Sequence, residues 1–166
     1  LASRLAKENN WGPKSFQQSA NFDLDSQTQT FVELSAGGAQ QFSKIIRDKL
    51  YSPYTWRIRH FAEGKTNETE VRFTPQGDFY GFYEHLSEDA PGKALPVTEA
   101  LRIAEKAASE KWHTQLERYQ LIEKSQETRP SGRIDHSFVY EAKSEKLSAG
   151  TLGEGKYRLR LVVSGD

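Results

Sequence analysis

The segment TEVRFTPQGD, residues 69–78, has a counterpart near the other end of the chain in YRLRLVVSGD, residues 157–166. When the two are aligned, an apolar–Arg–apolar triplet coincides in the middle and a Gly-Asp pair coincides at the end. Upstream of each, TWRIRHF at 55–61 and DHSFVYE at 135–141 share a similar alternating pattern, which is typical of strands with one buried face.

A second similarity lies farther upstream, in segments that we expect to be helical. RLAKE at 4–8 resembles RIAEK at 102–106, and both run on to a tryptophan, Trp11 and Trp112 respectively. Short matches arise by chance, but these occur in the same order in each half. The shared order predicts an internal repeat.

The predicted fold class is therefore α+β, with two tandem units, residues 1–95 and 96–166, each a helix packed on a small antiparallel sheet. The first unit has an extra helix at about 39–50, where apolar residues form a stripe. A further strand, 79–86, follows the first Gly-Asp pair, whereas the sequence ends at the second. We expect the second unit to lack its last strand and to leave 156–163 as a sheet edge.

Three local predictions complete this picture. The β-favouring residues of 19–34 predict a strand. Residues 75–78 predict a tight turn in which Gly77 supplies a positive φ. Thr98 is predicted to cap a helix whose apolar stripe ends at Trp112, which would make that tryptophan a core residue.

Composition excludes several classes of function. The chain has 166 residues, 36% of them apolar and 28% charged, and its 23 basic and 23 acidic residues cancel. A net charge of zero argues against a nucleic-acid partner. The chain has no Cys and therefore no disulfide or thiolate chemistry. No apolar run is long enough to insert into a membrane. Because the chain starts at Leu1 and contains no Met, we expect it to be part of a longer protein.

No motif points to catalysis, a metal or a cofactor, and we expect none of the three in this chain. Nucleophile motifs, phosphate-binding loops and HExxH are absent from the sequence. His60, His85 and His136 lie on predicted strands and would have to meet on one sheet face to bind zinc.

A binding face on the sheets is the more specific of two hypotheses for the strand residues. Aromatic residues are dense on the predicted strands, and arginines alternate with apolar residues, so that the arginines share the wet face. The candidate peptide- or anion-binding face consists of Arg57, Arg59, Arg72, Tyr80 and Tyr83. In the alternative interpretation, the aromatic residues form the core, and the arginines, including Arg158 and Arg160, pair with glutamates such as Glu68, Glu70, Glu84 and Glu141 across strands.

Three longer segments resemble a known family. RPSGRIDHSFVYE at 129–141 and GEGKYRLRLVVSGD at 153–166 resemble the soluble region that precedes the membrane part of large bacterial CAAX-protease-like intramembrane proteins. VRFTPQGDFYGFYEHLSEDAPGKAL at 71–95 resembles the preceding repeat of the same proteins. The resemblance covers roughly 56–166, and each half also looks like a PepSY domain.

The resemblance implies a non-catalytic accessory domain, regulatory or substrate-recognising, of a CAAX-type membrane metalloprotease. The parent would be membrane-anchored, this domain would be extracytoplasmic, and its partners would be the membrane part of the same polypeptide or a peptide or protein substrate. The family's paired-glutamate motif does not occur here, so no catalytic residue is carried over. Two alternatives stay open: a free-standing periplasmic peptide- or protease-binding module with a cystatin-like layout, and a small enzyme with a cavity in a curved sheet.

Overall fold

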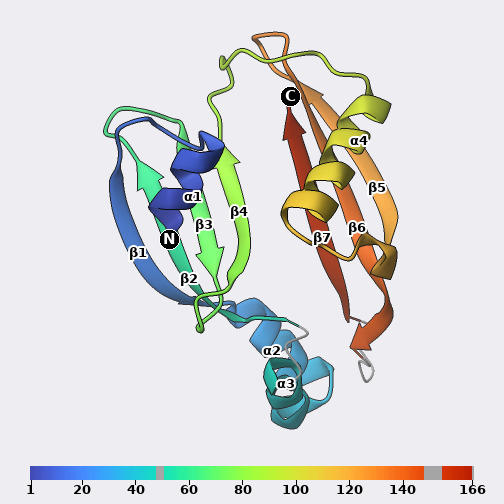
Figure 1. The fold of residues 1–166 in the computed structure, drawn as a ribbon. Helices are drawn as coiled ribbons and strands as arrows, with labels where there is room; N and C mark the ends of the chain where they lie inside the picture. The colour runs from blue at the N-terminus through green and yellow to red at the C-terminus, as the bar shows by residue number, and fades with distance from the viewer. Residues whose placement is uncertain (48–50, 148–154, 166) are drawn as a thin grey trace. The chain divides into compact units, whose positions relative to one another are not determined.

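The computed structural model describes residues 1–47, 51–147 and 155–165. The fold class is α+β, as predicted, and the chain divides into two compact units, Leu1–Ser87 and Glu88–Asp166 (Figure 1). This boundary lies eight residues before the predicted one at 95/96, because Leu95 packs in the core of the second unit.

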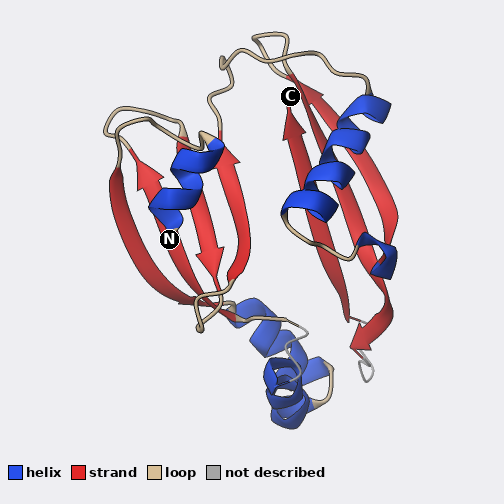
Figure 2. Cartoon of the chain, viewed as in Figure 1, coloured by secondary structure: helices blue, strands red, loops and turns tan. Residues whose placement is uncertain are grey.

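The first unit places a helix on a four-stranded antiparallel sheet of order β1-β2-β3-β4. A pair of helices, α2 and α3, is inserted between the first two strands (Figure 2). The elements in chain order are α1 Ala2–Asn9, β1 Gln17–Leu24, α2 Ser26–Ser35, α3 Gly38–Arg47, β2 Tyr54–Phe61, β3 Glu68–Phe73 and β4 Phe79–His85.

The second unit places a helix on a three-stranded antiparallel sheet of order β5-β6-β7. The main helix continues into a π-helical turn, η1, and a short 3-10 turn, η2, precedes the sheet. The elements are α4 Val97–Lys106, η1 Ala107–Lys111, η2 Leu116–Arg118, β5 Tyr119–Thr128, β6 Ile134–Leu147 and β7 Gly155–Ser164.

Both units therefore run helix, then three antiparallel strands in sequential order, if the inserted α2–α3 pair is set aside. Val71 on β3 and Leu159 on β7, which the sequence alignment matches, both lie on third strands. The described part of the second sheet has no counterpart of β4, so that β7 is an edge strand of its sheet.

The core of the second unit forms between small residues on the helix and large ones on the sheet. Ala100 and Ala104 on α4 are buried against Phe138 and Tyr140 of β6 and Val163 of β7. Alanines let the helix axis approach the sheet closely, and the alternation of β6 sends every second side chain to that face.

Of three local predictions, the structure corrects the strand at 19–34 and the cap at Thr98 and confirms the turn at 75–78. The strand predicted for 19–34 ends at Leu24, because Asp25 caps α2 by accepting a hydrogen bond from the Thr28 amide at 3.0 Å. The cap residue of α4 is Pro96 rather than Thr98. The turn after β3 is confirmed, with Gly77 at φ 91° and its amide bonded to the Thr74 carbonyl at 2.9 Å.

Trp112 is not the buried core residue that the helical stripe predicts. The stripe is buried as far as Ala108, but Ala107–Lys111 forms a π-helical turn. Such a turn inserts an extra residue and rotates the next part of the chain off the stripe. Trp112 is consequently half-buried, with the Lys111 ammonium 5.3 Å from its ring centroid.

A buried ionic clasp ties the start of β6 to the loop between β4 and α4. Arg133, 1% exposed, donates hydrogen bonds to the Asp135 carboxylate at 2.8 and 3.2 Å and to the Ala90 carbonyl at 2.7 Å. Arg129 donates a further bond of 2.6 Å to Asp135. A Cβ at Gly92 would lie 2.5 Å from Arg133 Cδ, so the loop needs glycine there. The segment 129–135 therefore has a structural role in this unit.

Burial alone would raise the pKa of Asp135, but the hydrogen bonds from Arg133 and Arg129 outweigh it and hold that pKa below its usual value. A carboxyl whose folded pKa is lowered contributes stability above its unfolded value of about 4, and this contribution is lost as the pH falls through the folded pKa.

We predict that Asp135→Asn lowers the free energy of unfolding at neutral pH by on the order of 3 kcal/mol, because Arg133 keeps its buried charge and loses its counter-ion. The variant should also lose less stability than the wild type between neutral pH and about pH 3. Urea unfolding followed by circular dichroism measures both. Glu110→Gln, at an exposed position of the same unit, is the control. If the free energy of unfolding fell equally with pH in the wild type and in Asp135→Asn, the stabilising role of the clasp would be contradicted.

Candidate functional site

The sequence-predicted arginines lie together on the face of the first sheet that α1 does not cover. Strand register places Arg57, Arg59 and Arg72 on this face, opposite the face that holds buried Val71. The structure thus brings the three guanidinium groups onto adjacent strands, as the hypothesis of a binding face requires.

Carboxylates on the same face neutralise these arginines. Arg57 Nε lies 2.7 Å from Asp23 Oδ2, and Arg59 Nη2 lies 2.5 Å from Glu68 Oε2. Glu70 is shared, 2.7 Å from Arg72 Nε and 3.8 Å from Arg57 Nη1. Arg57 and Arg59 thus pair across strands, as in the alternative interpretation, whereas Arg72 pairs with Glu70 of its own strand. Glu84 takes no part, since its carboxylate accepts the Gly12 amide at 2.9 Å.

The two tyrosines of the predicted face border a shallow hollow. Gly81 stands opposite Arg72 and contributes no side chain, which leaves an open hollow of about 470 Å³ between Tyr80 and Tyr83. Tyr83 is 56% exposed, whereas the Tyr80 hydroxyl accepts the Ser52 amide at 3.5 Å. Arg72 forms one wall of the hollow, and its pairing with Glu70 leaves this wall without net charge.

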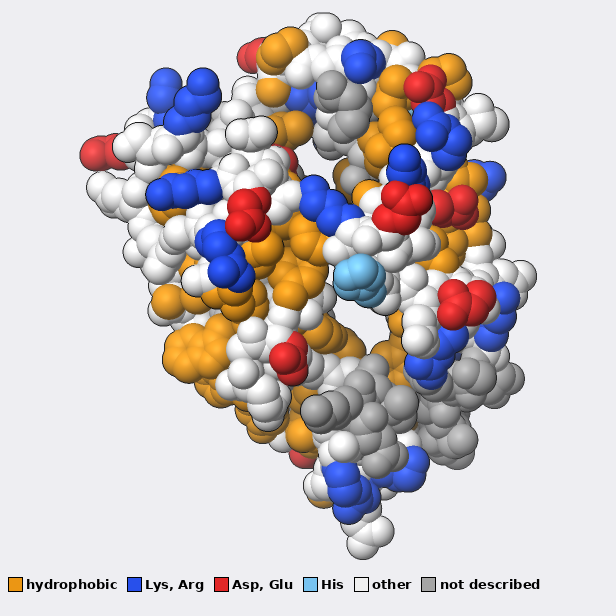
Figure 3. All heavy atoms as spheres, in the orientation of Figure 1, with side chains coloured by type: hydrophobic (Ala, Val, Ile, Leu, Met, Phe, Trp, Pro, Cys, Tyr) orange, Lys and Arg blue, Asp and Glu red, His pale blue; other side chains and the backbone are white. Residues whose placement is uncertain are grey.

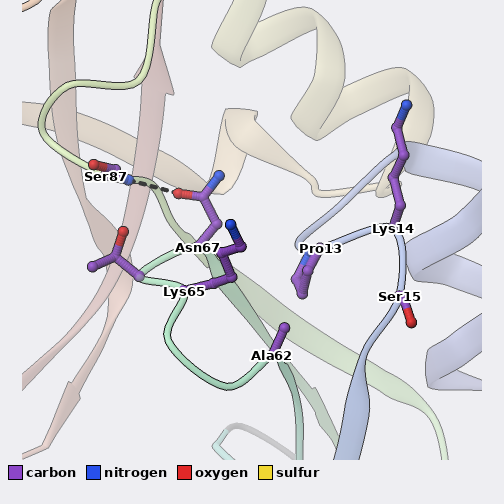
Figure 4. A pocket seen from close by; sticks show the side chains of 8 residues that line it. Pro13, Lys14, Ser15, Ala62, Lys65, Asn67 and Ser87 are labelled. Atoms are coloured by element: carbon purple, nitrogen blue, oxygen red, sulfur yellow. Dashed lines mark hydrogen bonds between the residues drawn. The ribbon is translucent and has the colours of Figure 1, made fainter.

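A second hollow, of about 530 Å³, lies at one end of the same sheet (Figure 4). Asn67 accepts the Ser87 amide at 2.8 Å on one side, and Pro13 lines the other. Lys65 and Lys14 belong to the lining, but Figure 4 shows Lys14 extending away from Asn67. The residues lining these two hollows include no Asp or His.

The histidines do not converge. His60 and His85 belong to opposite faces of the first sheet, and His136 belongs to the other sheet. His60 is fully buried, its Nε2 lies 3.0 Å from Gln18 Oε1, and burial lowers the pKa of its imidazole. His136 is also fully buried, with Nε2 2.8 Å from the Leu95 carbonyl oxygen. Within the described ranges, no group of three or more His, Asp or Glu residues could hold a metal ion.

The helix side of the first sheet carries the feature that the sequence did not locate. Phe22 and Leu24 of β1, Trp56 of β2 and Phe82 of β4 share this face by register, and we call them the aromatic patch. Their exposed fractions are 50%, 40%, 42% and 41%. Figure 3 shows hydrophobic side chains gathered on this part of the surface, below α1.

Packing within the patch is ordered. The Phe22 and Trp56 rings lie 4.9 Å apart between centroids, and Phe82 stacks on Trp11 at 4.0 Å. Trp11, which follows α1, is itself buried. The aromatic residues of the predicted strands are therefore divided, with Phe73 in the core and Trp56 and Phe82 only half-covered. Phe22 and Leu24 were missed because they lie on a polar strand, and only their pairing with β2 reveals their neighbours.

Comparison with known proteins gives no identification: no family model, curated protein or solved structure matches the chain. In the part of the chain that the structure describes, no helix is both long and apolar enough to cross a bilayer.

The ion pairs on the arginine face predict that inorganic phosphate at millimolar concentration leaves the thermal midpoint of the wild type unchanged, relative to chloride at equal ionic strength. Glu70→Gln removes the carboxylate that Arg57 and Arg72 share and should create a phosphate-dependent rise. Glu63→Gln, in the turn after β2, is the control. A phosphate-dependent rise in the wild type as large as in Glu70→Gln would show that the face binds anions in spite of its carboxylates.

Proposed function

We propose that the chain is a non-catalytic polypeptide-binding module that recognises its partner through the aromatic patch. The single observation that carries the proposal is the half-exposure of Phe22, Leu24 and Trp56 on the neighbouring strands β1 and β2, with Phe82 half-exposed on β4 of the same face. Contiguous exposed apolar surface is rare on soluble domains and marks interaction sites. Tryptophan in particular is enriched among the residues that contribute most to binding energy.

The patch offers enough apolar surface for moderate affinity. Full burial of a large apolar side chain contributes about 1.5–3 kcal/mol relative to full exposure. The three neighbouring side chains on β1 and β2, at about half exposure, therefore offer on the order of 3 kcal/mol before the cost of association, so that ordered backbone contacts would be needed for tight binding.

The location of the patch indicates where such backbone contacts arise. Phe22 and Leu24 belong to β1, which is an edge strand of its sheet as described. A bound segment that presents two or three large aliphatic or aromatic side chains to the patch lies beside this edge. It can add main-chain hydrogen bonds there. The preferred ligand is accordingly an extended polypeptide with apolar side chains on one face.

The biological context that we propose rests on the sequence resemblance. In it the chain is an extracytoplasmic accessory domain of a bacterial CAAX-type membrane metalloprotease, and the patch binds either a protein substrate or the membrane part of the same polypeptide. A free-standing binding module would use the same patch. An Asp or His in a pocket would favour the small-enzyme alternative, and neither of the two hollows described on the first unit is lined by one.

A display library of unstructured twelve-residue peptides, panned on the intact chain, tests the proposal. We expect enriched peptides with apolar residues at alternating positions. Trp56→Ala should weaken their binding by at least tenfold, about 1.4 kcal/mol. Tyr83→Ala is the matched control, because Tyr83 is an exposed aromatic residue on the opposite face of the same sheet.

Two outcomes would overturn the assignment of the patch. One is a panning experiment in which no sequence is enriched over an unrelated protein. The other is the reverse mutational pattern, in which Tyr83→Ala abolishes binding and Trp56→Ala has no effect. Isothermal titration calorimetry on the purified variants distinguishes these results, with circular dichroism to verify that each variant is folded.

A further inference from the structure

The second unit carries a separate surface, the edge of β7 that has no neighbouring strand among the described residues. This strand pairs with β6 on one side, and its sheet, as described, contains no strand on the other side. Its backbone amide and carbonyl groups on that side have no ladder partner among the described residues. An edge of this kind is a template for pairing with another extended chain unless charge or shape prevents it.

The two faces of β7 differ in chemistry. Leu159 and Leu161 are partly buried and pack against the core under α4. On the opposite face Arg158 and Arg160 alternate with them, as the register with Glu141 and Val139 shows. An incoming strand thus meets an apolar row on one face and a cationic row on the other.

The cationic row is only partly neutralised by the described residues. Glu141 is shared between Lys156 Nζ at 2.6 Å and Arg158 Nη2 at 3.7 Å. Arg160 Nε donates to the Ser137 hydroxyl at 2.8 Å. Three cations and one carboxylate leave an excess of positive charge along this edge, in contrast to the balanced arginine face of the first sheet.

This charge excludes the simplest partner, a second copy of β7. A symmetric pair of β7 strands would run antiparallel with the same face up, and would bring the arginines of one copy against those of the other. Like charges directly opposite on neighbouring strands are destabilising. The strand therefore favours a partner of opposite charge over itself.

The acidic edge of the same sheet is a less suitable partner than a separate segment. β5 carries Glu123 and Glu127 on the face of Arg158 and Arg160. Its other face, however, presents Lys124 and Gln126 where the apolar row of β7 needs apolar contacts. Pairing of β5 with β7 of another copy would also be a heterologous contact, which continues from copy to copy unless the rotation closes a ring.

We propose that β7 binds a partner polypeptide as an added strand, and that the preferred segment alternates acidic with apolar residues. The acidic side chains face Arg158 and Arg160, and the apolar ones extend the row of Leu159 and Leu161. This surface lies on a different unit from the aromatic patch and does not depend on it.

Three blocked nine-residue peptides test the proposal on the intact chain. One alternates Glu with Val or Ile, the second has Lys in place of every Glu, and the third is the Glu peptide with alternate backbone nitrogens methylated. We expect saturable binding of the Glu peptide, at least tenfold tighter than the Lys peptide and weaker at high salt. The methylated peptide should lose binding, because it cannot complete the ladder.

Variants and hydrogen exchange locate the site. The double variant Arg158→Glu, Arg160→Glu should prefer the Lys peptide, whereas Arg102→Glu, Lys106→Glu on α4 makes the same charge change and should keep the wild-type preference. Binding of the Glu peptide should slow amide exchange in Gly155–Ser164.

Equal binding of the two charged peptides would overturn the proposal. Slower amide exchange at β1 or β4 without slower exchange at β7 would also overturn it. So would slow exchange at β7 without peptide, if light scattering showed that the protein associates with itself. Binding of the Glu peptide to aromatic-patch variants such as Trp56→Ala should be unchanged, which separates a failure of this proposal from a failure of the proposed function.

Discussion

An antiparallel sheet with one apolar face persists in water only if something covers that face, and the length of the covering helix governs both units of this protein. In the second unit α4 and η1 run from Val97 to Lys111 over a three-stranded sheet. In the first unit the eight residues of α1 face a four-stranded sheet. Trp11 extends the cover by stacking on Phe82, and Phe16 extends it by stacking on His60, but Phe22 and Trp56 stay half-exposed.

Most other features that could bind something are already satisfied internally. The arginines of the first sheet pair with Asp23, Glu68 and Glu70. His60 and His136 are buried and hydrogen-bonded through Nε2, although the Nδ1 atom of each has no hydrogen-bond partner among the described residues. Arg133 and Asp135 belong to a segment on which the sequence resemblance depends, and they form hydrogen bonds within their own unit. Among the described residues, the aromatic patch and the cationic edge of β7 are two surfaces that are not satisfied in this way.

Much of the fold could be predicted from the sequence because its signals are local. Alternation identified the strands around Ile58, Val71 and Phe138, and Gly77 identified the turn. α2 was missed because Thr30 and Val32 favour strands, whereas the Asp25 cap starts a helix. Trp112 was misplaced because the π-helical turn before it has no clear sequence signature.

The candidate site was harder to predict, because exposure depends on contacts between distant segments. The alternation around Arg57 and Arg72 correctly placed the arginines on one face, but only the register shows that Asp23 and Glu70 reach them. Likewise, nothing local in β1 shows that Phe22 lies beside Trp56, beyond the end of the helix that covers the sheet.

The most direct test of the central claim monitors the indole N–H signals of Trp11, Trp56 and Trp112 by NMR while a peptide selected on the intact chain is added. If the uncovered part of the first sheet is the binding surface, the Trp56 signal shifts saturably with the peptide and the Trp112 signal, which belongs to the second unit, does not move. A saturable shift of Trp112 with no change at Trp56 would contradict it.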